Sequence, residues 1–117
     1  MRSRRRGSSL PDDCLFCRLA REGDHVAKTE GFAAIRDINP RAETHLLVLP
    51  ERHIDTFRDV GEFTAEESKR LLEFVAETAS AAGLEDYRVR VNVGRGGGQD
   101  VFHLHWHILG GELRGAA

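Results

Sequence analysis

The chain has 117 residues, of which 40% are hydrophobic and 31% charged, as is typical of one ordinary globular domain. The formal net charge is −2, but four arginines within the first six residues contribute +4, so the remaining sequence carries −6. An acidic body argues against a general nucleic-acid-binding surface. No apolar run approaches the roughly 18 residues that cross a bilayer, and no hydrophobic segment typical of a secretory signal follows the basic start.

These features predict a basic, disordered tail over residues 1–11 and a single domain with one hydrophobic core over residues 12–117. The two cysteines, Cys14 and Cys17, cannot build a disulfide framework, which fits a cytoplasmic protein. We therefore expect neither a membrane nor a nucleic-acid partner.

The first half of the chain predicts one short helix and three strands. Asp12 and Asp13 are placed to cap a helix over residues 14–22. Residues 27–38 alternate like two strands around a Glu-Gly turn, and residues 44–49 (THLLVL) form a compact apolar strand.

A long helix follows an irregular segment over residues 51–62. Thr64 and Glu67 have the spacing of a capping box, and the helix they open runs to about Ala82, before Gly83. Its expected apolar face consists of Leu71, Leu72, Val75 and Ala79.

Two alternating segments near the end of the chain predict an antiparallel hairpin. Residues 87–93 (YRVRVNV) and residues 101–111 (VFHLHWHILGG) are joined by the glycine-rich residues 94–100. Together these elements predict an α+β fold, with an antiparallel sheet of about five strands, one long helix and one short N-terminal helix.

The glycine-rich loop at residues 94–100 has two interpretations. It leads into a strand and lacks the G-K-[ST] of a P-loop, so it is not a nucleotide-binding loop of that kind. It is either a flexible connection or a backbone nest whose amides approach an anion.

Three histidines, His103, His105 and His107, lie two residues apart, so a strand places them on one face. The residues around them are large and apolar: Phe102, Leu104, Trp106 and Ile108. Imidazoles can bind a metal or perform nucleophilic and acid–base chemistry. At this spacing the three histidines cannot readily all bind one zinc ion, which favours nucleophilic and acid–base chemistry.

The sequence HLHWHIL at residues 103–109 resembles the H-φ-H-φ-H-φ-φ signature of the histidine triad family, in which φ is apolar. Residues 32–40, 44–50 and 92–99 also resemble the nucleotide-binding Hint branch of that family, in the right order. The resemblance covers residues 12–111.

This resemblance implies a nucleotidyl hydrolase or transferase that acts on the α-phosphate of purine nucleoside 5′-phosphoramidates or related AMP derivatives. It implies that His105 attacks phosphorus to give a nucleotidyl-histidine, that His107 contacts the phosphate oxygens, and that His45 supports the triad. It also implies a homodimer with a continuous sheet.

The positions that the resemblance assigns to nucleotide binding surround the same motifs. Asp37 corresponds to the carboxylate that accepts hydrogen bonds from the ribose hydroxyls. The whole set is Phe16, Leu19, Ile35, Asp37, Ile38, Asn92, Gly98 and Asp100. Asp100 departs from the family, which usually has Ser or Thr there, and its charge predicts either an altered leaving-group preference or a reduced phosphoramidase activity.

The C-x-x-C at Cys14 and Cys17 has three interpretations: buried structural cysteines, a redox pair, or half of a zinc site. Some histidine triad relatives use this pair, a histidine after the Pro-x-x turn and the first triad histidine to hold structural zinc. The resemblance therefore implies zinc on Cys14, Cys17, His53 and His103.

Two alternatives to a phosphoramidase remain open. One is a dinucleoside polyphosphate hydrolase or phosphorylase of the same superfamily. The other is a nucleotide-binding regulatory module with weak catalysis, which the aspartate at position 100 favours and the retained His105 opposes.

Overall fold

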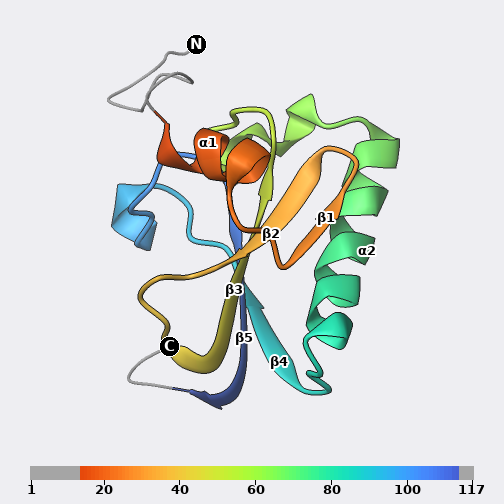
Figure 1. Cartoon of the computed structure of the whole chain (residues 1–117). Helices are drawn as coiled ribbons and strands as arrows, with labels where there is room; N and C mark the ends of the chain where they lie inside the picture. Colours follow the sequence, from red (N-terminus) through yellow and green to blue (C-terminus); the bar gives the residue numbers. More distant parts are fainter. Residues whose placement is uncertain (1–13, 114–117) are drawn as a thin grey trace.

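The computed structural model describes residues 14–113, so the expected tail over residues 1–11 and the expected caps Asp12 and Asp13 lie outside the described residues. Within that range one antiparallel sheet organises the chain (Figure 1). Its strand order is β1-β2-β3-β5-β4. The strands are β1 (Ala27–Thr29), β2 (Phe32–Arg36), β3 (Ala42–Pro50), β4 (Tyr87–Arg90) and β5 (Trp106–Leu113). This confirms the predicted α+β class.

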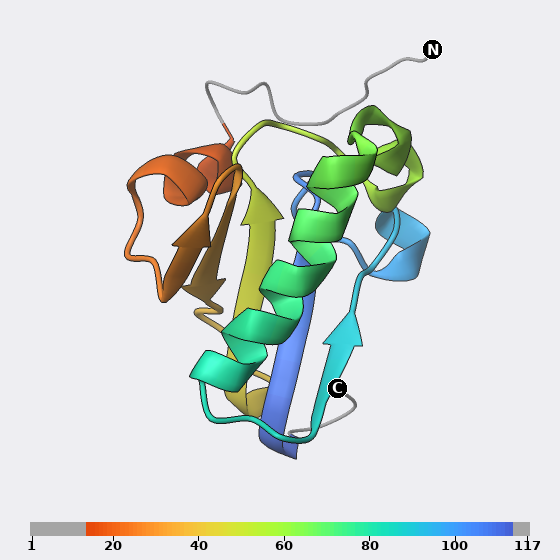
Figure 2. The ribbon, with the colours of Figure 1, turned by 90° about the vertical axis from the view of Figure 1, so that its right-hand side faces the viewer.

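Helices lie on both faces of the sheet (Figure 2). The long helix α2 (Ala65–Ala81) packs on one face and the short helix α1 (Leu15–Glu22) on the other. Two 3-10 helices, η1 (Phe57–Glu62) and η2 (Arg95–Gly97), lie in the connections. None of the described helices is both long and apolar enough to cross a membrane.

The capping box that begins α2 is confirmed. The backbone N–H of Glu67 donates to Thr64 Oγ1 (3.0 Å), and the N–H of Thr64 donates to Glu67 Oε1 (2.8 Å). Both partners lie within four residues of each other, so this contact forms from local sequence alone.

The hydrophobic core is divided by the sheet, which corrects the expectation of one cluster. Because successive strand side chains point to opposite faces, each strand contributes to both sides. The α2 side contains, among others, Phe32, Ala34, Leu46, Val48, Leu104, Trp106 and Ile108. The α1 side contains Cys14, Phe16, Cys17, Ala20, Ala33, Ile35, Leu47 and Leu49.

The predicted apolar face of α2 was wrong at one position. Leu72 is 66% exposed, whereas Phe74 is 4% exposed and packs in the α2-side cluster. The buried stripe of α2 is Leu71, Phe74, Val75, Thr78 and Ala79. These residues follow the spacing i, i+3, i+4, i+7 and i+8, and Leu72 lies about 100° away from Leu71 around the helix.

The hairpin of β4 and β5 is confirmed, with Arg90 opposite His107, but both strands are shorter than predicted. Residues 91–93 and 101–105 belong to no strand. In the second segment the N–H of Leu104 donates to the carbonyl of Ile54 (2.6 Å), outside the sheet. The side chains nevertheless alternate as predicted, with Leu104 in the α2-side cluster and His103 against the cysteines of the α1 side.

Gln99 holds the glycine-rich loop in one conformation. Its buried amide accepts from the N–H of Gly94 (2.8 Å) and donates to the carbonyls of Asp55 (2.7 Å) and Val101 (3.0 Å). Gly94 and Gly98 have φ of 76° and 91°, a region that favours glycine. The loop is therefore an ordered turn rather than a flexible connection.

Phe74→Ala and Leu72→Ala provide a matched test of the α2 packing. Phe74→Ala removes a buried ring and should lower the free energy of unfolding by about 3–5 kcal/mol. Leu72→Ala, on the exposed side of the same helix, should change it by less than about 0.5 kcal/mol. Urea denaturation followed by circular dichroism measures both; equal losses would contradict the observed helix orientation.

Candidate active site and metal cluster

A cavity of about 1020 Å³ lies on the α1 face of the sheet. Side chains from successive strands form its floor: Asp37 follows β2, His45 is on β3, His107 on β5 and Arg90 on β4. The remaining lining residues are Leu15, Phe16, Ile38, Asn39, Pro40, Arg41, Leu47, Asn92, Gly98, Asp100, Val101 and His105.

A backbone carbonyl fixes the hydrogen position on His105. Its Nδ1 lies 2.7 Å from the carbonyl oxygen of His103, which can only accept, so Nδ1 carries the hydrogen. In the neutral ring Nε2 then holds a free lone pair. The Phe16 ring packs edge-on against His105 at 5.0 Å between centroids and keeps the imidazole in place.

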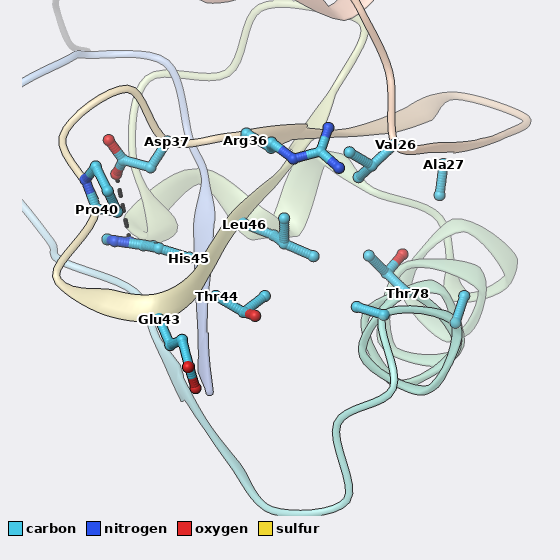
Figure 3. Close-up of a pocket in the computed structure, with 12 residues that line it drawn as sticks. Val26, Ala27, Arg36, Asp37, Pro40, Glu43, Thr44, His45, Leu46 and Thr78 are labelled. Atoms are coloured by element: carbon cyan, nitrogen blue, oxygen red, sulfur yellow. Dashed lines mark ion pairs between the residues drawn. The ribbon is translucent and has the colours of Figure 1, made fainter. Parts of the chain in front are cut away.

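A chain of hydrogen bonds fixes the other two imidazoles. The N–H of Arg41 donates to His45 Nδ1 (2.9 Å), so the hydrogen of His45 is on Nε2, which donates to His107 Nδ1 (2.9 Å). Asp37 Oδ2 lies 3.3 Å from the same His45 Nε2 (Figure 3). His107 must then carry its hydrogen on Nε2, and this buried atom has no hydrogen-bond partner among residues 14–113.

All three rings are neutral at pH 7. Burial lowers the pKa of His105, and it also lowers the pKa of His45, where the charge of Asp37 opposes it. Burial, together with the neighbouring His105 and Arg90, lowers the pKa of His107 to about 3. The cavity is therefore lined by two neutral imidazoles with ring centroids 5.0 Å apart, His105 with a lone pair on Nε2 and His107 with a hydrogen on Nε2.

Six of the eight residues predicted for nucleotide binding line this cavity: Phe16, Asp37, Ile38, Asn92, Gly98 and Asp100. Leu19 and Ile35 do not line it and pack in the α1-side cluster. Leu15, Arg41, Leu47 and Arg90 line the cavity without having been predicted. Ile38 lies at the edge of the cavity, where its apolar side chain is 89% exposed.

Two predicted residues have a clear local geometry. Asp37 Oδ1 accepts from the N–H of Asn39 (2.8 Å), which orients the carboxylate and leaves further lone pairs for other donors. A Cβ at Gly98 would meet only Asn92, at 3.7 Å or more, so there is room for a side chain. The backbone φ of +91° is what favours glycine at this position.

A smaller cavity of about 400 Å³ lies between β3 and the C-terminal half of α2 (Figure 3). Arg36, Leu46 and Thr78 line it, together with Asp37 and His45, which also border the larger cavity. The larger cavity, with His45, His105 and His107, is therefore on one side of β3, and this smaller cavity is on the other.

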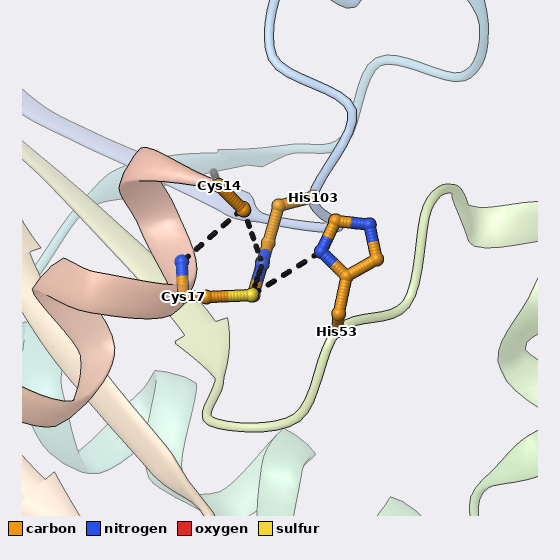
Figure 4. A group of neighbouring side chains, drawn as sticks. All are labelled: Cys14, Cys17, His53 and His103. Carbon is orange, nitrogen blue, oxygen red and sulfur yellow. Dashed lines mark hydrogen bonds between the residues drawn. The ribbon is translucent and has the colours of Figure 1, made fainter. Parts of the chain in front are cut away.

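The four predicted metal ligands come together at the N-terminus of α1 (Figure 4). Cys14 Sγ lies 3.3 Å from His103 Nδ1, and Cys17 Sγ lies 3.3 Å from His103 Nδ1 and 3.2 Å from His53 Nδ1. All four ligand atoms lie within 4.8 Å of one another. In a tetrahedral zinc site, ligand atoms are separated by about 3.3–3.8 Å, so this cluster fits the ion.

Hydrogen bonds on the far side of each ring prepare both histidines as ligands. His103 Nε2 donates to the carbonyl of Pro50 (2.8 Å), and His53 Nε2 donates to Asp55 Oδ1 (2.6 Å). Each Nδ1 is therefore a free lone pair directed at the sulfur atoms. Such supporting carbonyl and carboxylate acceptors are typical of histidine ligands to zinc.

The charge of the cysteine pair also suits a cation. Burial raises the pKa of the Cys14 thiol, but the neighbouring His103 and His53 outweigh this and bring the pKa down to about 5. Burial and the adjacent Cys14 raise the pKa of Cys17 to about 12. Asp37, His45 and His107 also cluster, but the His45 nitrogen that faces the other two residues is Nε2, which carries the hydrogen because Nδ1 accepts from the Arg41 N–H; this disfavours a metal there.

Sequence reasoning missed the residues that hold the two sites in place. Pro50 accepts from His103 through its backbone carbonyl, so the identity of its side chain does not indicate this contact in the sequence. Asp55 lies two residues after His53, and this spacing is the one signal that points to a carboxylate–histidine pair. The alternation of residues 87–93 places Arg90 beside His107 once the hairpin register is known.

Comparison with known proteins agrees with this geometry. The HIT domain family model matches residues 19–113. Protein HitA of Neisseria gonorrhoeae is 37% identical over 103 residues, 85% of this chain and 96% of that protein. A purine nucleoside phosphoramidase of Escherichia coli (strain K12) is 33% identical over 111 residues, 91% of this chain and 93% of that protein.

Solved structures give the same result. A HIT family hydrolase from Legionella pneumophila Philadelphia 1 has a TM-score of 0.77 and 41% identity, covering 85% of this chain and 93% of that one. A HIT family hydrolase from Clostridium thermocellum has a TM-score of 0.79 and 32% identity, covering 91% of this chain and 96% of that one. On this evidence the chain belongs to the HIT family, the histidine triad family that its sequence resembles.

Proposed function

We propose that this protein is a nucleotidyl hydrolase that cleaves purine nucleoside 5′-phosphoramidates and related AMP derivatives at the α-phosphorus. The observation that best supports it is that one cavity is lined by His105, with a lone pair on Nε2, and by His107, whose Nε2–H has no hydrogen-bond partner among residues 14–113. The names of the Escherichia coli phosphoramidase and the Legionella hydrolase are consistent with this chemistry.

The cavity offers separate regions for the parts of a nucleotide. Phe16, Ile38 and Leu47 form an apolar region that suits a purine base. Asp37 also lines the cavity, and the carboxylate lone pairs that the Asn39 N–H does not engage can accept from ribose hydroxyls. The α-phosphate then lies against His105 and His107.

The reaction proceeds in two displacements at phosphorus. His105 Nε2 attacks the α-phosphorus, the bond from phosphorus to nitrogen breaks, and the amine departs with the electron pair and takes a proton from water. Water then attacks the nucleotidyl-histidine, the electron pair returns to Nε2, and a proton is released as the nucleoside monophosphate forms. The N–H of His107 donates to a phosphoryl oxygen in both steps, where negative charge develops.

His105→Ala tests the nucleophile. Loss of the attacking nitrogen should lower kcat/KM for adenosine 5′-phosphoramidate by at least about 1,000-fold. Calorimetric AMP affinity should change by less than about fivefold, because the other contacts remain. His25→Ala, whose ring bonds the carbonyl of Leu19 away from the cavity, is the matched control. Equal turnover by His105→Ala and wild type would exclude the mechanism.

The pH profile tests the neutrality of the rings. Protonation would remove the lone pair of His105, and burial shifts that event below the ordinary pKa of about 6.5. Burial lowers the pKa of His107 to about 3, so this ring stays neutral over the whole range. The kcat/KM for the phosphoramidate should therefore be flat between about pH 6.5 and 8 and fall only at lower pH. A midpoint of the acidic limb above about 6.5 would contradict this.

We further propose that Cys14, Cys17, His53 and His103 hold one structural zinc ion. The short sulfur–nitrogen distances and the two prepared Nδ1 lone pairs support this assignment. A bound zinc would tie α1 to the end of β3 and to His103, two residues before the proposed nucleophile. Its contribution is structural, since all four coordination positions are filled by protein atoms.

Metal analysis of the purified protein should find one zinc per chain, with Cys17→Ser losing most of it and His25→Ala keeping it. Chelation should lower the melting temperature, because zinc at 1,000 times its Kd stabilises the folded state by about 4 kcal/mol. A fully stable wild-type preparation that contains no metal would refute the zinc site.

A further inference from the structure

We propose that metal binding by Cys14, Cys17, His53 and His103 tightens nucleotide binding in the larger cavity, and that Gln99 is the positioning residue that couples the two sites. The metal is the zinc ion proposed above. This inference rests on the proposed function and adds a regulation of the same site.

The coupling begins at His53, a proposed metal ligand on the segment that follows β3 (Figure 4). Its Nδ1 lies 3.2 Å from Cys17 Sγ, and its Nε2 donates to Asp55 Oδ1 at 2.6 Å. The side chains of His53 and Asp55 are only 12% and 14% exposed, so water competes little for this hydrogen bond. A metal ion that fixes the His53 ring therefore also fixes Asp55.

Gln99 binds the same aspartate through its backbone. The Gln99 Nε2 donates one hydrogen to the Asp55 carbonyl (2.7 Å) and the other to the Val101 carbonyl (3.0 Å), and Oε1 accepts from the Gly94 N–H (2.8 Å). Both amide hydrogens are thus used. Because Gln99 is buried, a displacement of Asp55 would leave a polar group without its partner where water cannot replace it.

Gln99 also closes the glycine-rich loop on itself. Its backbone N–H donates to the Gly94 carbonyl (3.0 Å), in addition to the bond between its side chain and the Gly94 N–H. Residues 95–98 lie between these two bonded residues and are exposed, so packing contributes little to their position. The conformation of the loop therefore depends on these hydrogen bonds.

The loop forms one wall of the larger cavity. Gly98 and Asp100, which flank Gln99 in the sequence, line the cavity together with Val101, whose carbonyl Gln99 binds. Gln99 itself does not line the cavity, so it acts on a nucleotide only through these neighbours. A metal ion that fixes Asp55 should therefore hold this wall in the position that a bound nucleotide contacts.

A second path connects the two sites and does not involve Gln99. His103 contacts both cysteines, and its carbonyl accepts from His105 Nδ1 (2.7 Å). Changes of the Gln99 side chain leave these contacts in place. Variants of Gln99 therefore test the proposed coupling separately from this second path.

Gln99→Met and Arg95→Gln form a matched pair in one loop. Gln99→Met removes the side-chain hydrogen bonds at similar length, whereas Arg95 is exposed and does not line the cavity. In calorimetry, chelation of the metal should weaken AMP binding to wild type and to Arg95→Gln by about 10-fold, a usual factor for coupled sites. Gln99→Met should bind AMP about 10-fold more weakly than metal-loaded wild type and respond to chelation by less than about threefold.

Hydrogen exchange followed by NMR measures the coupling without nucleotide or turnover. In wild type, chelation should speed exchange of the Gly94 N–H by about 10- to 100-fold, because the Gln99 amide that accepts from it is held less firmly. The Glu67 N–H, in the local capping box of α2, is the internal reference and should change by less than about threefold. Equal acceleration at Gly94 and Glu67 would indicate general unfolding and would refute the coupling.

Two further measurements keep the test independent of one variant. Gln99→Asn keeps an amide that is one methylene too short to reach Asp55, so its AMP affinity should also respond to chelation by less than about threefold. Coupling between two sites is reciprocal, so saturating AMP should lower the zinc Kd of wild type by the same factor of about 10 and that of Gln99→Met by less than about threefold. Competition with a chelator of known affinity measures this Kd.

The outcomes separate failure of this inference from failure of the proposals above. If wild type binds no AMP, the proposed function fails; if it binds no zinc, the metal assignment fails; the coupling fails with either. If wild type binds both and its AMP affinity does not depend on the metal, the coupling alone fails. The coupling also fails alone if Gln99→Met responds to chelation as wild type does.

Discussion

Two backbone carbonyls determine what the histidines of this protein can do. The Pro50 carbonyl oxygen accepts a hydrogen bond from Nε2–H of His103, and the His103 carbonyl oxygen accepts one from Nδ1–H of His105. Because a neutral imidazole has one hydrogen and one lone pair, the two rings expose opposite nitrogens. His103 turns its lone pair to the cysteine sulfurs and His105 keeps Nε2 for the cavity. Residues of the same type two positions apart thus acquire different chemistry.

The division of the sheet into two faces makes this arrangement stable. Leu104, Trp106 and Ile108 are buried against α2, so the chain that carries the histidines is fixed from behind. The α1 face then holds both the cluster of Cys14, Cys17, His53 and His103 and the cavity. His103 links them, since it contacts both cysteines while its carbonyl orients His105. Loosening the cluster should therefore also disturb the hydrogen position on His105.

Local patterns in the sequence were sufficient for much of the fold. The capping box of Thr64 and Glu67 and the alternation around His107 depend on residues a few positions apart, so they could be predicted. The burial of Phe74 in place of Leu72 depends on how α2 is rotated against the sheet, which the apolar spacing left open. His53 and Cys17 are 36 residues apart, and only the family resemblance joined them. The contacts of Gln99 and Arg90 require the folded register.

Fixed hydrogen positions also bear on the energetics of the proposed reaction. Burial lowers the pKa of His45 most; Asp37 raises this pKa, and Arg90 and Arg41 lower it, so the ring stays neutral beside a carboxylate. His107, which lines the cavity, consequently carries its hydrogen on Nε2, the form that a phosphoryl oxygen requires, before any substrate arrives. A donor that is already oriented costs no reorganisation when charge develops on phosphorus.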